Sequence, residues 1–466
     1  MATHTLDTDY LVIGAGAAGM AFTDAVAADS SADVIVVDRR HAPGGHWNDA
    51  YPFVRLHQPS SYYGVNSLPL GGGTIDADGL NAGMYERATG AEICGYFDRV
   101  MHSHLLPSGA VRYHPMCEYD GDNGFVSLVT GDRYDVTVRR AVVDARYLSP
   151  SVPATSPPPF DIEAGVRCIP VGELAAVSEP PPRYVIVGAG KTAMDACVWL
   201  LGVGVEPERI RWVKPRESWL LNRYFVQSDD LVGNLVEGGA RQMQAAANAT
   251  SLADLFHRLE ESGILLRVDE RTTPTMFKMP TSSTAEIDEL RRIEDVVRLG
   301  HVQRVESRSM VLDEGAVSAD ADDLYVHCAA SGLNPAPAVP IFAPNRITLQ
   351  PIRSGLIPFN AAFVGYVEAS GRGADEKNRL CPANRMPDVP LDWVRGRLTE
   401  MAAERSWSKE PDIAEWLERS RLNHQRGVGE HRDEPAVRDA VGRFVECVRP
   451  GVARLMALFS EAQATG

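Results

Sequence analysis

The sequence has no uninterrupted stretch of about 20 apolar residues, the length that a membrane-spanning helix needs. Residues 1–9 have neither the basic nor the apolar region of a secretory signal peptide. Runs of basic residues are also absent, since 46 Lys and Arg face 62 Asp and Glu, giving a net charge of −16. A protein that binds duplex nucleic acid needs a basic face to neutralise phosphates. We therefore expect a cytoplasmic protein without membrane or nucleic-acid partners.

Cysteines are few and scattered. No two are separated by only two residues, so the CxxC pair of metal knuckles and of disulfide reductases is missing. The motifs GxSxG, HExxH and GxxxxGK[ST] are missing as well, and we expect no metal site. The thiols are expected to be reduced. They belong to Cys94, Cys117, Cys168, Cys197, Cys328, Cys381 and Cys447.

What the sequence does contain is a strand–turn–helix–strand unit near its start. Its elements are a strand at Tyr10–Ile13, a helix at Ala17–Ala28 and a strand at Val34–Val37. The turn has the pattern GxGxxG, in which Gly14 allows a tight turn, Gly16 lets backbone approach a pyrophosphate and Gly19 lets helix and strand pack closely. Asp38 ends the second strand, near the spacing of roughly 20 residues expected for an acid that binds a ribose. The unit predicts dinucleotide binding.

A second unit of the same plan occurs in mid-chain. It comprises a strand at Tyr184–Val187, a helix at Lys191–Leu201 and a strand at Ile210–Val213. Its turn contains Gly188, Gly190, Lys191, Thr192 and Ala193, the last being an accepted substitute for the third glycine.

The residue after the second strand distinguishes the two units. No acid follows Val213; Lys214-Pro215-Arg216 stands there instead. Cations in place of the acid favour the 2′-phosphate of NADP, and Arg216 is the better candidate because its planar fork grips phosphate bidentately. The alternative is a solvated basic loop.

Two nucleotides meeting at one site indicate electron transfer, and the usual pair is FAD and a nicotinamide. With 466 residues we expect an α/β fold of two doubly wound Rossmann-type domains, the second inserted in the first. Apolar runs at residues 324–326 and 361–364 are expected to be strands of the returning first domain. The expected boundaries are 1–150 with 322–387 for the FAD domain, 180–321 for the NADP domain, and 388–466 for a helical C-terminal cap.

Further motifs resemble the class B flavoprotein monooxygenases, that is, the flavin-containing and Baeyer–Villiger monooxygenases. The resemblance covers roughly residues 8–370. It rests on Gly44-Gly45-His46-Trp47, on the segment YPFVRLHQPS from Tyr51 to Ser60, on RESWLLNR from Arg216 to Arg223, and on HCAASG from His327 to Gly332. Two features depart from the family: its FxGxxxHxxxW linker signature is not recognisable between Ala141 and Arg183, and Asp144-Ala145-Arg146 stands at its first ATG-type turn.

The resemblance implies FAD and NADPH as cofactors, molecular oxygen as co-substrate, and a flavin C4a-(hydro)peroxide that oxygenates a small molecule. His57 stands where the family has a flavin-side Asp or Asn, so it is the catalytic candidate, an acid or base near neutral pH; the alternative is a structural histidine. Arg55 and Arg223 are expected at cofactor phosphates and Trp47 on a cofactor ring, against surface and core alternatives. The other expected cofactor-binding residues are Arg39, Gly45, His46 and Gln58.

Two other functions stay open. The missing linker signature is compatible with a flavin reductase, oxidase or dehydrogenase on the same scaffold, and a non-enzymatic nucleotide sensor is the third hypothesis. A disulfide reductase is disfavoured because no CxxC exists to take electrons from the flavin. The sequence identifies neither the substrate nor the oligomeric state, whether monomer or homo-oligomer.

Overall fold

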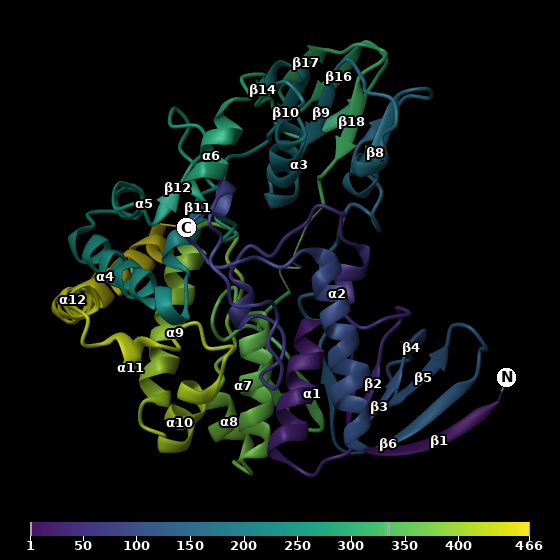
Figure 1. The fold of residues 1–466 in the computed structure, drawn as a ribbon, viewed down its shortest axis with the longest axis vertical. Coiled ribbons are helices and arrows are strands. Elements are labelled where there is room, and N and C mark those ends of the chain that lie inside the picture. The colour runs from purple at the N-terminus through teal and green to yellow at the C-terminus, as the bar shows by residue number, and fades with distance from the viewer. Residues whose placement is uncertain (1, 331, 333–335, 466) are drawn as a thin grey trace.

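The computed structural model describes residues 2–330, 332 and 336–465. A mixed sheet and a parallel sheet lie toward opposite ends of the long axis, and a helical region lies beside them (Figure 1). Of the HCAASG motif, Ser331 lies outside the described residues.

The first sheet has the order β19-β20-β6-β1-β2-β3, and its central strands are parallel. Its strands are β1 (Thr3–Ile13), β2 (Val34–Val37), β3 (Val111–His114), β4 (Cys117–Tyr119), β5 (Gly124–Ser127), β6 (Arg133–Asp144), β19 (Phe342–Ala343) and β20 (Arg346–Thr348). All four residues of β2 are buried, as expected for a strand covered on both faces. The predicted first unit is confirmed.

The second sheet has the order β14-β10-β9-β18-β8 and is parallel throughout. Its strands are β8 (Arg167–Pro170), β9 (Tyr184–Val187), β10 (Ile210–Val213), β14 (Val296–Val297) and β18 (Leu324–His327). The two predicted strands of the second unit have the observed bounds. Each sheet therefore places side by side the two strands that flank its glycine turn and helix, β1 with β2 and β9 with β10, which is the Rossmann arrangement.

Helices cover the sheets and build the third region. They are α1 (Ala17–Asp29), α2 (Gly90–Arg99), α3 (Lys191–Gly202), α4 (Val232–Asn248), α5 (Leu252–Glu261), α6 (Thr284–Arg291), α7 (Ile357–Ala369), α8 (Ala374–Leu380), α9 (Pro390–Trp407), α10 (Pro411–Arg419), α11 (Val428–His431) and α12 (Pro435–Thr465). Short strands form two small sheets: β11 (Leu220–Asn222), β12 (Leu265–Leu266) and β13 (Thr281–Ser282), and β7 (Asp161–Ile162), β15 (Val302–Val305), β16 (Ser309–Leu312) and β17 (Gly315–Ser318). The helical pattern predicted from residue 388 onward is confirmed.

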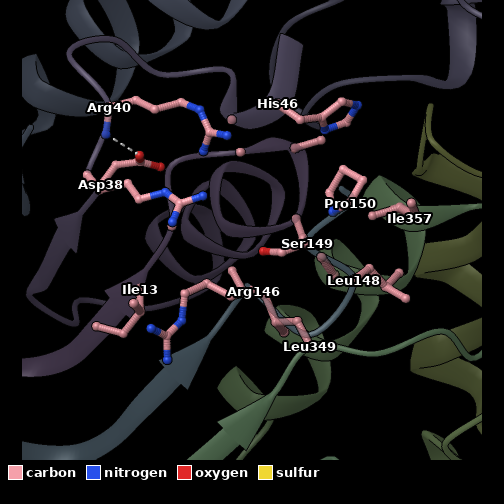
Figure 2. A pocket seen from close by; sticks show the side chains of 18 of the residues that line it. Ile13, Asp38, Arg40, His46, Arg146, Leu148, Ser149, Pro150, Leu349 and Ile357 are labelled. Carbon is pink, nitrogen blue, oxygen red and sulfur yellow. Dashed lines mark hydrogen bonds between the residues drawn. The ribbon is translucent and has the colours of Figure 1, made fainter. Parts of the chain in front are cut away.

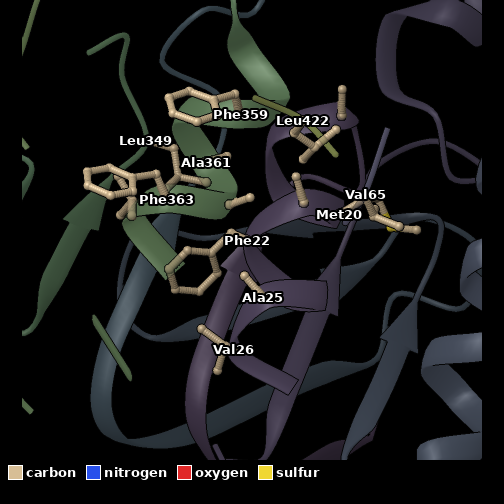
Figure 3. Close-up of a cluster of buried hydrophobic side chains, with 14 of the residues drawn as sticks. Met20, Phe22, Ala25, Val26, Val65, Leu349, Phe359, Ala361, Phe363 and Leu422 are labelled. Carbon is tan, nitrogen blue, oxygen red and sulfur yellow. The ribbon is translucent and has the colours of Figure 1, made fainter. Parts of the chain in front are cut away.

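The prediction of a strand at 361–364 was wrong, because these residues lie in helix α7. The helix is apolar on nearly all sides, so its sequence has no helical periodicity and looks like a buried strand. It packs against α1, where a Cβ on Gly365 would lie 3.0 Å from the Cβ of Ala25 (Figure 3). The absence of a side chain at Gly365 lets the two helices approach closely.

The strand at residues 324–326 exists, but it was assigned to the wrong sheet. Strand β18 pairs with β9 and β8 in the second sheet, with Val326 opposite Ile186 and Ile169. The chain returns to the first sheet only at β19 and β20. A continuous apolar run predicts a buried strand, but it does not tell which of two similar sheets accepts it.

Within the described part of the chain, every helix is too short or too polar to cross a bilayer. All seven cysteines are free thiols.

Candidate functional site

The first glycine turn joins β1 to α1. The N–H of Gly14 donates to the carbonyl of Val37 at 2.8 Å, and the φ of Gly14, +111°, lies in the left-handed region that favours glycine. A Cβ on Gly19 would lie only 1.9 Å from the carbonyl oxygen of Gly14. Helix α1 can therefore begin against β1 only because position 19 has no side chain.

A second loop approaches this turn closely. A Cβ on Gly45 would lie 2.9 Å from the Cα of Gly16, so the two backbones meet with no room for a side chain. Both glycines line one cavity. Its wall is here formed by backbone and by the N-terminus of α1, whose free N–H groups attract anions. This surface is suited to a pyrophosphate.

The cavity has a volume of about 240 Å³ and lies at the carboxyl edge of the first sheet (Figure 2). Six of the predicted residues line it: Gly14, Gly16, Asp38, Arg39, Gly45 and His46. Sequence reasoning missed others from distant parts of the chain, among them Tyr119, Arg146, Ser149, Gln350 and Asn360. The unusual Asp144-Ala145-Arg146 turn was the one signal that could have indicated a lining residue.

Asp38 is 6% exposed and directly follows β2, at the cavity. One carboxylate oxygen accepts a hydrogen bond from the N–H of Ala15 at 2.7 Å, and the other accepts one from the N–H of Arg40 at 2.8 Å. Since a carboxylate offers about four acceptor positions, Asp38 can still accept bonds from ribose hydroxyls. The same charge disfavours a 2′-phosphate.

His46 and Trp47 form a stacked pair with ring centroids 5.1 Å apart. Only His46 of the two lines the cavity, and the indole N–H of Trp47 donates to the hydroxyl of the lining residue Tyr63 at 2.7 Å. Burial, and then the charge of Arg40, lowers the pKa of His46 to about 4. The cavity wall therefore carries a neutral imidazole at physiological pH.

The second glycine turn joins β9 to α3. The N–H of Gly188 donates to the carbonyl of Val213 at 3.0 Å, and the φ of Gly188 is +145°. Gly190 is exposed, and a Cβ placed on it would have no heavy atom within 4 Å. Ala193 is fully buried against the sheet, as its position in the fingerprint requires. The N-terminus of α3 is thus open to an anion.

The loop after β10 leaves one cation exposed. Lys214 is 1% exposed and pairs with Glu217 at 2.5 Å, and Arg298 pairs with the same carboxylate at 3.0 Å. Arg216, between them in sequence, is exposed. The charge of Glu217 is therefore neutralised by its neighbours. The guanidinium of Arg216 faces solvent at the carboxyl end of β10, on the same edge of the sheet as the second turn.

The segment from Tyr51 to Ser60 joins the two domains. The hydroxyl of Tyr51 donates to Asp195 of α3 at 2.7 Å, and Phe53 stacks on Trp199 of the same helix with centroids 4.8 Å apart. Lys191 also pairs with Asp195. Because α3 follows the second turn, this segment connects the loop at Gly45, which contacts the first turn, to the helix of the second turn.

His57 lies in that segment and is half-buried. Burial, and then the charge of Lys191, lowers its pKa to about 3. A positive neighbour and a poorly solvated position both favour the neutral ring, and the acid–base role of His57 stays a prediction. At physiological pH it is a neutral hydrogen-bonding group.

Three other predicted residues lie close to His57 in sequence or space. Arg223 is fully buried, where it donates to Glu286 at 2.7 Å and to the carbonyl of His57 at 2.9 Å. Its charge is thus balanced by Glu286 instead of facing an open phosphate site. Arg55 is exposed and donates to the carbonyl of Arg87 at 3.1 Å, and Gln58 is half-buried.

Residues 12–63 match the family described as the NAD(P)-binding Rossmann-like domain. The uncharacterized protein Rv2000 of Mycobacterium tuberculosis is 47% identical over 420 residues, which is 90% of this chain and 78% of the relative. The uncharacterized protein Mb2023 of Mycobacterium bovis has the same values. The chain belongs to the family of these mycobacterial proteins.

This chain also has distant likenesses among solved structures, including the following three. A cyclohexanone monooxygenase has a TM-score of 0.48 and 11% identity, with 93% of this chain and 98% of that one covered. A flavin-containing monooxygenase from Stenotrophomonas maltophilia has a TM-score of 0.44 and 14% identity, with 78% of this chain and 97% of that one covered. A bacillithiol disulfide reductase from Staphylococcus aureus has a TM-score of 0.41 and 10% identity, with 78% of this chain and 97% of that one covered.

Proposed function

We propose that this chain is an FAD- and NADPH-dependent oxidoreductase, and that it uses molecular oxygen to oxygenate a small-molecule substrate. The observation that carries the proposal is the pair of Rossmann turns in one chain, linked by the segment from Tyr51 to Ser60. Two dinucleotides bound at linked turns can exchange electrons, and a flavin with a nicotinamide is the usual pair.

The first cavity fits FAD. Its glycine cradle has no room for a Cβ at Gly45, and the open backbone faces the N-terminus of α1, where a pyrophosphate binds best. Asp38 has acceptor capacity left for a ribose. His46 and Tyr63 extend the wall beyond the turn. Gly14, Gly16 and Asp38 are thus our proposed first contacts.

The second turn fits NADPH. Gly190 leaves open space at the N-terminus of α3, and Arg216 presents a guanidinium to the position that a 2′-phosphate would take. Lys191, which pairs with Asp195, adds a positive charge near the turn. We assign the nicotinamide coenzyme to this domain on these three features.

When bound, a flavin supplies hydride acceptance and the reaction with oxygen. The chain's own contribution is orientation and a constant charge state. His57 would offer a neutral imidazole beside the reacting rings, because its pKa of about 3 keeps it unprotonated. The link between Tyr51 and Asp195 would hold the flavin-side segment against α3.

Oxygenation is favoured by the GGHW and YPFVRLHQPS segments, and the missing CxxC pair disfavours a disulfide reductase. The second candidate is a reductase, oxidase or dehydrogenase on the same scaffold, favoured by the missing linker signature between Ala141 and Arg183. The two differ in the fate of oxygen, since only a monooxygenase transfers one oxygen atom to its substrate.

Isotope labelling separates the two candidates. The purified protein is supplied with NADPH, ¹⁸O₂ and a panel of amines, thioethers and ketones, while NADPH consumption, hydrogen peroxide and product mass are measured. A monooxygenase gives a product heavier by one ¹⁸O atom for each NADPH consumed with that substrate. Full recovery of the electrons as hydrogen peroxide across the panel would support the oxidase. A protein that purifies without flavin and binds none would contradict both.

A further inference from the structure

One end of the first cavity has a flat, charged wall. The guanidinium carbon of Arg146 lies 5.4 Å from the ring centroid of Tyr119, and both residues line the cavity. In Figure 2, Asp38 and Arg146 lie toward one side of the cavity, while Pro150 and Ile357 lie toward the other. Arg146 is therefore at the end that Asp38 marks.

The position of Arg146 is fixed from behind. Asp144 accepts hydrogen bonds from the Nε of Arg146 at 3.0 Å and from its Nη2 at 3.1 Å. Arg346 donates to the same carboxylate at 2.5 Å. Burial raises the pKa of Asp144, but the hydrogen bonds from Arg146 outweigh it, so the net pKa is lowered and the carboxylate stays charged. A charged Asp144 orients the plane of the guanidinium.

The charge of Arg146 is already balanced. Besides Asp144, Glu118 acts on its charge from the cavity wall, and Glu118 precedes Tyr119 on β4. A cation with two acidic neighbours is a poor site for a further phosphate. Its flat face, however, stacks well on an uncharged aromatic ring.

These observations point to a base. If Asp38 holds the ribose of the first dinucleotide, the base attached to that ribose lies beyond Asp38, at the end where Arg146 and Tyr119 stand. We propose that Arg146, oriented by Asp144 and backed by Tyr119, stacks on the adenine of the dinucleotide and anchors it in the first cavity. This rests on the proposed FAD site, and it gives a function to the turn that departs from the family pattern.

The proposal is tested by calorimetric titration of the flavin-free full-length chain with ADP, which has the adenine, and with FMN, which lacks it. Arg146→Ala should weaken ADP binding about tenfold and leave FMN binding unchanged. Arg146→Lys keeps the charge without the flat face and should lose most of the same affinity. Arg346→Ala is the matched control, because Arg346 contacts Asp144 and is not among the cavity-lining residues. It should change ADP binding less than twofold.

Several results would overturn the proposal: wild-type affinity for ADP in Arg146→Ala, equal losses in Arg146→Ala and Arg346→Ala, equal losses for ADP and FMN, or no ADP binding by the wild-type chain. Circular dichroism checks that each variant is folded. If an Arg146 variant does not fold, Tyr119→Leu replaces it, with an expected loss of ADP affinity of about threefold. Failure of oxygenation appears in the ¹⁸O experiment and leaves ADP binding intact, so the two proposals fail separately.

Discussion

The hydroxyl of Tyr51 donates a 2.7 Å hydrogen bond to Asp195, and this bond joins the segment beside the first cavity to the helix that begins at the second turn. Tyr51 is 9% exposed, so the bond is largely shielded from water. Burial, and then the charge of Asp195, raises the pKa of Tyr51, so the phenol stays protonated and remains the donor.

Tyr51→Phe should therefore lower the free energy of unfolding by about 2 kcal/mol, because a buried hydrogen bond to a charged group is lost. Urea denaturation measures this value. Tyr224→Phe is the control, since Tyr224 is 46% exposed and should change stability by less than about 0.5 kcal/mol. Equal losses in both variants would contradict a specific role for the Tyr51 bond.

Gly19 and Gly190 should respond oppositely to alanine. Gly19→Ala places a Cβ 1.9 Å from the carbonyl oxygen of Gly14 and should cost about 3 kcal/mol or more of stability. Gly190→Ala meets nothing within 4 Å, so the protein should remain folded while its NADPH affinity falls, because the Cβ occupies the proposed phosphate approach. Thermal melting and NADPH titration measure the two effects. Unchanged NADPH binding in Gly190→Ala would show that the coenzyme does not bind at this turn.

Arg216→Ala should raise the KM for NADPH at least about tenfold and leave the KM for NADH nearly unchanged, because NADH has no 2′-phosphate to lose a charged partner. Arg304→Ala provides the control, as Arg304 is 53% exposed on β15 of the same domain and pairs with Glu306. Parallel changes for both coenzymes would show that Arg216 does not read the 2′-phosphate.

Glu286 should make stability depend on pH. Burial raises its pKa, but the charges of Lys191, Arg223 and Arg87 lower it further, so the net pKa falls well below the ordinary 4.5. A carboxyl group with a lowered pKa stabilises the folded state at pH values above the unfolded-state pKa, which is about 4.5. This stability is lost progressively as the pH falls below that value. Glu286→Gln should lower the free energy of unfolding by about 3 kcal/mol at pH 7, since Arg223 is left buried and unpaired. When the pH is then lowered, the variant should lose less of its remaining stability than the wild type does, because it has no carboxylate to protonate at this position.

Denaturation curves at pH 7 and at pH 3.5 test this prediction, with Glu289→Gln on the more exposed side of the same helix as the control. The control should follow the wild-type curve. A Glu286→Gln variant that follows it too would show that the pair with Arg223 contributes little.

His57 should not shape the pH profile of NADPH oxidation. Because its folded pKa is about 3, the ring is neutral from pH 5 to pH 8. His57→Asn should change the rate through lost contacts and leave the shape of the profile over this range unaltered. Stopped-flow flavin reduction at several pH values measures this. An ionisation near pH 6.5 that disappears in His57→Asn would instead show that His57 is an acid or base in the reaction.

Local patterns predicted the parts of the fold that local physics determines. The strands and helices around both glycine turns were predicted to within one residue except for the start of β1, which lies at Thr3 instead of Tyr10, because a buried parallel strand and a glycine turn leave a short-range signature. Helix α7 was missed for the opposite reason, since it is apolar all round. The sheet that accepts β18 depends on the neighbours of Val326, which lie far away in sequence.

The residues of the candidate site were likewise predictable where a local motif contains them, and not where distant segments supply them. Gly14, Gly16, Asp38 and Gly45 meet at the cavity as their motifs indicated. Arg223 carries a charge that looks available in sequence, yet Glu286, 63 residues later, neutralises it in the interior. Lining residues such as Gln350 and Asn360 come from the other end of the first domain, and no local pattern connects them with the glycine turn.

Helix α7 also has a consequence for the order in which the protein is made. Phe363 packs on Trp407 and Trp416, with ring centroids 4.7 Å and 5.4 Å apart, so α7 is covered only when α9 and α10 are present. Asn360 and Ala361 of the same helix line the first cavity. A nascent chain therefore cannot complete this cavity until Ala361 has left the ribosome, although the glycine turn at its centre was synthesised about 350 residues earlier. Cofactor capture would then come late in synthesis, after the second domain has emerged.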